Sequence, residues 1–78
     1  MDTFIPLYKL KIGQRAAVRE IYSDSGIRRR LMDMGLVENT CVECVGKSPL
    51  GDPSAYLIKG AVVAVRSRDC ESIFVEVI

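Results

Sequence analysis

The sequence of 78 residues contains no histidine and no tryptophan, and it has only three cysteines. Without histidine the chain lacks the commonest metal ligand and the commonest general base at neutral pH. A nucleophilic triad is therefore excluded, and the carboxylates are scattered singly rather than paired for acid–base catalysis. The odd number of cysteines gives no evident disulfide framework and favours a reducing cytoplasm. We expect neither an enzyme nor a bound cofactor.

Long apolar runs are also absent, since the longest covers only residues 61–65. A helix that spans a bilayer needs roughly 20 apolar residues, so we expect no membrane-spanning segment. No basic-then-apolar leader precedes Leu7, and nothing in the sequence predicts secretion. The net charge of +1 argues against a generic polyanion binder but is compatible with a local basic patch. The length predicts a single domain, 1–78.

The most informative stretch is an amphipathic segment at residues 25–36. Ile27, Leu31 and Met34 recur at i, i+4 and i+7, which predicts one buried stripe of an α-helix. Gly35 is placed to adopt the left-handed conformation that ends a helix, and Leu36 to contact Leu31 in a Schellman ending. The residues able to cap its start are Ser23, Asp24 and Ser25. A helix this short is marginal alone, so the rest of the chain must bury its stripe.

Most of the remaining sequence predicts strands. The alternating segments are 15–22, 40–45, 55–58, 61–66 and 73–77, with a loop at 46–53 and single helical turns near Leu7 and at 67–72. Segment 15–22 has apolar residues on both parities, which indicates a bulge or a strong bend. Lys59-Gly60 is typical of a hairpin turn. Five short antiparallel strands predict a mainly β fold, a small barrel with the helix over one open end.

Two sequence patterns resemble a metal site and a phosphate-binding loop, but neither meets the structural requirements of its motif. Cys41 and Cys44 have the spacing of a zinc half-site, but in a strand residues i and i+3 face opposite sides. We therefore expect no native metal site, although an exposed Cys41 could bind metal adventitiously. Gly46-Lys47-Ser48 matches the end of a phosphate-binding loop, but the preceding glycine is missing and Pro49 prevents the helix that should follow.

The arginine run of the helix has two interpretations. Arg28, Arg29 and Arg30 fall on its flanks and back, where Asp33 is spaced to pair with Arg29 or Arg30. The run is either a solvated helix face or a surface for a protein partner. Nucleic acid is less well supported because no exposed aromatic residues are interleaved with the arginines. Met32 lies off the stripe, on the arginine side, and could mark an interaction surface.

Three further arginines could extend this patch, and the sequence does not place them. They are Arg19, Arg66 and Arg68.

Four motifs occur in order along the chain. They are Leu7-x-x-Leu10-x-x-Gly13, Arg30-Leu31-Met32-Asp33-Met34-Gly35-Leu36, Pro49-Leu50-Gly51-Asp52-Pro53, and Gly60 followed by Val65-Arg66. In combination they resemble the FeoA family of ferrous-iron-transport proteins. The resemblance implies a Src-homology-3-like barrel, and a small cytoplasmic accessory of the FeoB membrane GTPase that carries ferrous iron. One departure is Glu38-Asn39, where the family often has Pro-Gly in the turn after the helix.

The resemblance makes the principal hypothesis an adaptor that docks onto an FeoB-like transporter and acts in metal homeostasis. The candidate partner-binding residues lie in the helix and in the loop at 46–53, and they are Arg28, Arg29, Arg30, Leu31, Met32, Gly51, Asp52 and Pro53. One alternative is a transition-metal-binding or sensing module, like the C-terminal domain of some iron-dependent repressors, with Cys41 among its ligands. Another is a small-barrel nucleic-acid binder. Whether the chain forms a homo-oligomer stays open.

Overall fold

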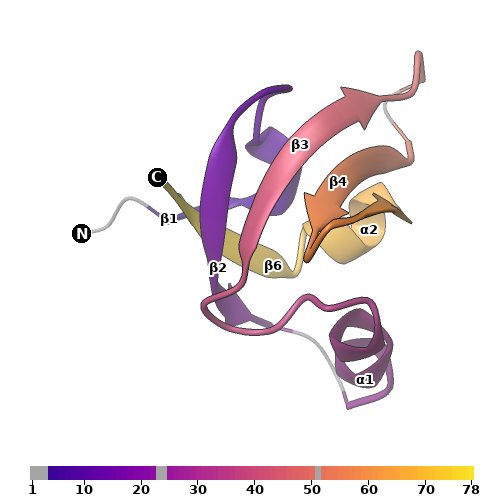
Figure 1. Cartoon of the computed structure of the whole chain (residues 1–78). Coiled ribbons are helices and arrows are strands. Elements are labelled where there is room, and N and C mark those ends of the chain that lie inside the picture. The colour runs from indigo at the N-terminus through magenta and orange to yellow at the C-terminus, as the bar shows by residue number, and fades with distance from the viewer. Residues whose placement is uncertain (1–3, 23–24, 51) are drawn as a thin grey trace.

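The computed structural model describes residues 4–22, 25–50 and 52–78 (Figure 1). The elements in chain order are β1 (Phe4–Pro6), the short 3-10 helix η1 (Leu7–Lys9), β2 (Arg15–Ile21), α1 (Ser25–Asp33), β3 (Cys41–Lys47), β4 (Ser54–Ile58), β5 (Ala61–Val65), α2 (Ser67–Cys70) and β6 (Ile73–Val77). The predicted mainly β fold with one principal helix is confirmed.

The strands form one antiparallel sheet of six strands in the order β1-β6-β2-β3-β4-β5. The sheet is strongly bent, and α1 lies beside one end of it (Figure 1). The additional strand relative to the sequence prediction is β1, which pairs Phe4 with Glu76 and Ile5 with Val75. Its three residues are too few to show an alternating pattern, and Pro6 argues against a strand in the sequence.

Strand β2 contains the predicted bulge, because its register with β6 shifts between Val18 and Glu20. The bulge explains why Val18 before it and Ile21 after it are both buried although they have opposite parity. It also directs Arg19 outward, where Nε donates to Glu76 at 2.8 Å and Nη1 donates to the side chain of Asn39 at 2.8 Å. Asn39 adopts a φ of 72° in the turn after α1, a conformation that asparagine tolerates better than most residues.

Strand β3 is longer than the sequence predicts. It extends through Gly46 to Lys47, so the loop that we expected to begin at residue 46 begins at Ser48. The reason is a second bulge, between Cys44 and Gly46, which carries the pairing with β4 beyond the point where the alternation ends.

The core lies inside the bend of the sheet. Its completely buried side chains include Tyr56, while Ile58 is only 2% exposed. The Tyr56 hydroxyl donates to the carbonyl oxygen of Leu7 at 3.3 Å, which attaches η1 to the core. The other largest buried side chains are Leu7, Leu10, Leu31, Leu36, Ile73, Val18, Val42, Val65, Val75 and Cys44.

The C-terminal end of α1 is the predicted Schellman motif. The Leu36 N–H donates to the Leu31 carbonyl at 2.9 Å, the Gly35 N–H donates to the Met32 carbonyl at 2.9 Å, and Gly35 has a φ of 95°. Leu31 and Leu36 are both fully buried. Of the candidate N-caps, Ser23 and Asp24 lie outside the described residues, and Ser25 is the first residue of the helix.

Gly35→Ala should lower the free energy of unfolding by about 2 kcal/mol or more. The substitution forces a side chain into the left-handed region, and its Cβ would lie 3.0 Å from Cγ2 of Ile58. The matched control is Gly60→Ala, which has a φ of +84° but meets nothing within 4 Å. Denaturant unfolding of both variants measures the difference. A loss for Gly35→Ala no larger than that for Gly60→Ala would contradict close packing of this turn on β4.

Candidate docking cleft

Helix α1 presents three different surfaces to its surroundings. The stripe predicted from the sequence faces the core, where Leu31 is fully buried and Ile27 and Met34 are half-buried. One flank carries Arg30 and borders a cleft, and the opposite flank carries Arg28 and Met32. Leu31 has no exposed surface, so it is not available for direct contact with a partner. We therefore assign Leu31 to the core and not to the partner-binding surface.

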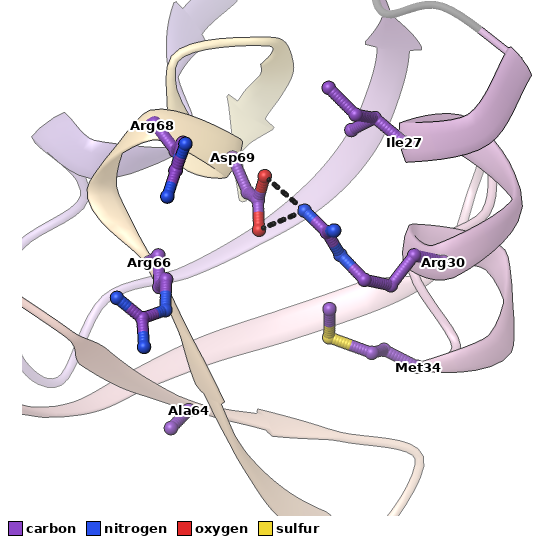
Figure 2. A pocket seen from close by; sticks show the side chains of 7 residues that line it. All are labelled: Ile27, Arg30, Met34, Ala64, Arg66, Arg68 and Asp69. Atoms are coloured by element: carbon purple, nitrogen blue, oxygen red, sulfur yellow. Dashed lines mark hydrogen bonds and ion pairs between the residues drawn. The ribbon is translucent and has the colours of Figure 1, made fainter.

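The cleft lies between α1 on one side and the end of β5 with α2 on the other (Figure 2). Its volume is about 450 Å³. Its lining residues are Ile27, Arg30, Met34, Ala64, Arg66, Arg68 and Asp69. The structure therefore places two of the unassigned arginines, Arg66 and Arg68, near the arginine run of α1.

An ion pair connects the two walls of the cleft. Nη2 of Arg30 contacts both carboxylate oxygens of Asp69, at 2.8 Å and 3.0 Å. The Asp69 side chain is only 4% exposed, whereas that of Arg30 is 55% exposed. We expected Arg29 or Arg30 to pair with Asp33 inside the helix, and for Arg30 this is wrong. The burial of Asp69 explains the preference, because a desolvated carboxylate requires a charged partner more than an exposed one does.

The remaining charge of the cleft is positive. Arg66 and Arg68 are exposed, and neither forms an ion pair with any carboxylate in the part of the chain that the structure describes. Three arginines and one aspartate thus line the cleft. The apolar side chains of the lining are Ile27, Met34 and Ala64. Arg19 is not part of this group, because it binds Glu76 and Asn39.

The opposite flank of α1 is a shallower surface. Nη1 of Arg28 donates to the Ile21 carbonyl at 3.2 Å, and Met32 is 51% exposed beside it. These residues border a pocket of about 100 Å³ together with Val37 and Glu38. Met32 is therefore an exposed apolar side chain next to an arginine, as its position off the stripe predicts.

The predicted loop candidates serve partly to hold α2. The Asp52 carboxylate accepts a hydrogen bond at 2.8 Å from the N–H of Ser67, the first residue of α2, and the Asp52 N–H donates to Oγ of Ser48 at 2.9 Å. A carboxylate in this position satisfies a free N–H group at the helix start. Pro53 is exposed, and Gly51 lies outside the described residues. Helix α2 thus contacts the loop through Ser67 and α1 through Asp69.

The cysteines are arranged as the strand geometry predicts. Cys41 is exposed and Cys44 is buried, so the two thiols face opposite sides of β3. Cys70 is also buried, and desolvation raises the pKa of its thiol to about 11. No group of three or more metal-ligating side chains occurs in the described ranges. Within the same ranges, no helix is long and apolar enough to cross a membrane.

Comparison with known proteins gives consistent matches. A family model described as the FeoA domain matches residues 5–77. A curated relative is the Fe(2+) transport protein A/Fe(2+) transporter FeoB fusion protein of Porphyromonas gingivalis, which is 32% identical over 72 residues. The match covers 92% of this chain but only 8% of the fusion protein.

Two solved structures show the same fold. A FeoA-like protein from Clostridium acetobutylicum superposes with a TM-score of 0.90 at 36% identity, covering 100% of this chain and 91% of that one. FeoA from Stenotrophomonas maltophilia, complexed with zinc and described as a prokaryotic SH3 domain protein, gives a TM-score of 0.79 at 25% identity, covering 92% and 89%. The predicted Src-homology-3-like fold is confirmed.

The pair of Arg30 and Asp69 should show a larger coupling energy than the pair of Arg19 and Glu76. Unfolding of Arg30→Ala, Asp69→Asn and the double variant completes one cycle, and the corresponding variants of Arg19 and Glu76 complete the control. We expect about 1 kcal/mol or more for the first pair and less for the second, because only the first has a buried carboxylate. Equal coupling energies would contradict a special role of Asp69.

Cys41 should be the only thiol that reacts rapidly with Ellman's reagent in the folded protein at pH 8. Cys44 and Cys70 should react only after unfolding, because they are buried. Cys41→Ser is the control and should abolish the rapid phase.

The raised pKa of Cys70 adds a pH dependence to the free energy of unfolding. The contribution of Cys70 to stability is complete below the ordinary thiol pKa of 9.0 and is lost as the pH rises through about 11. In the reaction with Ellman's reagent, two rapidly reacting thiols would contradict the burial of Cys44 and Cys70.

Proposed function

Because the chain belongs to the FeoA domain family, we propose that it is a cytoplasmic accessory protein of ferrous iron uptake that binds an FeoB-like membrane GTPase transporter. One observation carries the proposal: in the Porphyromonas gingivalis relative, the matching segment and an FeoB transporter are parts of one fusion protein. Covalent linkage keeps two domains at a high effective concentration, which is useful when the separate domains must associate. The family link to ferrous iron transport makes the transporter the natural partner.

The exposed surface of α1 supports a role in binding. Met32 is half exposed beside Arg28, and Arg29 lies on the side of the helix away from the buried stripe. Methionine and arginine are enriched at protein interfaces, whereas an isolated solvated helix face has little need of an exposed methionine. We therefore keep Arg28, Arg29 and Met32 as partner-binding residues in the proposal, with Arg30 assigned to the cleft.

Metal binding by Cys41 is a second candidate, because a related FeoA has been solved in complex with zinc. In this chain the surroundings of Cys41 include Glu43, which is one potential ligand, but also Arg15 and Lys59. Two cations beside the thiol oppose the binding of a third. Anaerobic titration with ferrous iron or zinc separates the candidates, since stoichiometric binding lost in Cys41→Ser would favour the metal site.

Arg29→Glu and Met32→Glu should each weaken binding to the isolated cytoplasmic portion of the transporter roughly tenfold, because each places a carboxylate in the proposed interface. Co-purification followed by calorimetric titration measures the effect. Both positions are exposed, so the unfolding midpoint should stay close to that of the wild type.

The control is Arg15→Glu, which makes the same charge change as Arg29→Glu, and a larger one than Met32→Glu, at an exposed position of β2. It should bind like the wild type. If both helix variants bind as tightly as the control, the exposed surface of α1 is not the interface. If the wild type itself does not bind, the proposed function fails.

A further inference from the structure

We propose that the cleft between α1 and the end of β5 with α2 binds an extended segment of the partner in which an acidic residue adjoins an apolar one. This inference rests on the proposed function, since it takes the segment to come from the cytoplasmic portion of the transporter. It adds a second contact region on α1, on the flank opposite to Arg28 and Met32, and it specifies the chemistry of the segment.

The charge of the cleft favours an acidic group. Arg30, Arg66 and Arg68 line it with Asp69 as the single carboxylate, which leaves two formal positive charges. Like charges that gather in a concave site repel one another, and an anionic ligand relieves that repulsion. Arginine also offers several N–H donors in a planar arrangement that matches a carboxylate.

Arg30 is held in place for such a contact before any ligand arrives. Its hydrogen bonds to Asp69 both come from Nη2, so Nε and Nη1 make no hydrogen bond within the described residues. Asp69 itself is fixed in α2 and almost completely buried. Figure 2 shows the Arg30 side chain reaching from α1 across to Asp69, at the mouth between the two walls. An oriented arginine loses less conformational freedom on binding than a free one, which increases affinity.

The apolar part of the lining favours a hydrophobic side chain next to the acidic one. Ile27 and Met34 are half-buried and leave part of their surface on the cleft, and Ala64 lies across from them (Figure 2). Methionine adapts its shape to irregular apolar partners. A volume of about 450 Å³ accommodates a few side chains, within the usual range for binding sites.

An extended conformation of the bound segment follows from the position of β5. This strand is the last in the described sheet order, bonded only to β4, and it contributes Ala64 to the cleft. The free edge of a strand has backbone groups available for another extended chain. Val62 on the same strand is 66% exposed, which adds apolar surface outside the cleft.

Nucleic acid fits this cleft less well than an acidic peptide. The Asp69 carboxylate lies among the arginines, and the lining includes three apolar side chains that offer nothing to a phosphate backbone. The net charge of the chain is only +1, so a long polyanion gains little from the rest of the surface.

The test compares two double variants that remove the same charge. Arg66→Ala with Arg68→Ala changes the cleft, and Arg15→Ala with Lys59→Ala changes the separate surface beside Cys41. All four positions are exposed, so we expect both double variants to fold. In titrations against the isolated cytoplasmic portion of the transporter, the cleft variant should raise the Kd roughly tenfold or more, and the control less than threefold.

A neutral variant separates shape from charge. Ala64→Trp places a large side chain in the cleft at an exposed position, and it should also raise the Kd roughly tenfold without a change of charge. Overlapping peptides from the cytoplasmic portion then identify the segment, and the peptides that bind should pair an acidic residue with an apolar one.

The outcomes distinguish this inference from the function on which it rests. If the wild type and both cleft variants bind equally tightly, the proposed function stands and the cleft inference is wrong. If the charge control weakens binding as much as the cleft variant, the effect is a general one of charge, and the cleft inference is also wrong. If the wild type does not bind at all, both proposals fail. If the cleft variants bind more weakly than the wild type and the charge control does not, the result supports both the proposed function and the cleft inference.

Discussion

Two buried leucines attach α1 to the sheet, and the arrangement of both flanks of the helix depends on them. A helix of nine residues is marginal in isolation, so its position is set by the burial of Leu31 and Leu36. Gly35 makes this possible, because its left-handed conformation turns the chain back so that Leu36 is buried beside the helix end. The turn lies so close to Ile58 that a Cβ would crowd it. Once this contact is made, Arg30 faces the cleft and Met32 faces the opposite flank.

Helix α2 completes the arrangement from the other side. It has only four residues. The Asp52 carboxylate accepts a hydrogen bond from the N–H of its first residue, and its Asp69 forms the ion pair with Arg30. Two segments that are distant in sequence, the loop after β3 and α1, therefore meet at α2, which directly follows the end of β5. The Asp52 loop and α1 are therefore connected through α2, and Asp52 itself acts within the fold.

The features that depend on local sequence could be predicted, and those that depend on distant pairing could not. The stripe of Ile27, Leu31 and Met34 and the bulge near Val18 follow from periodicity alone. The ion pair of Arg30 with Asp69 joins residues 39 positions apart, and no local pattern distinguishes it from a pair with Asp33. Strand β1 is too short to show alternation. The cleft was missed for the same reason, because α1, β5 and α2 come together only in the folded chain.

In the proposed complex, the partner docks on α1 and on the cleft beside it. The most direct measurement is a nuclear magnetic resonance titration of the isotopically labelled protein with the unlabelled cytoplasmic portion of an FeoB-like transporter. We expect the largest amide shift changes in α1, at Ala64 and at Asp69. Changes confined to β1 and β6, at the other edge of the sheet order, would contradict it.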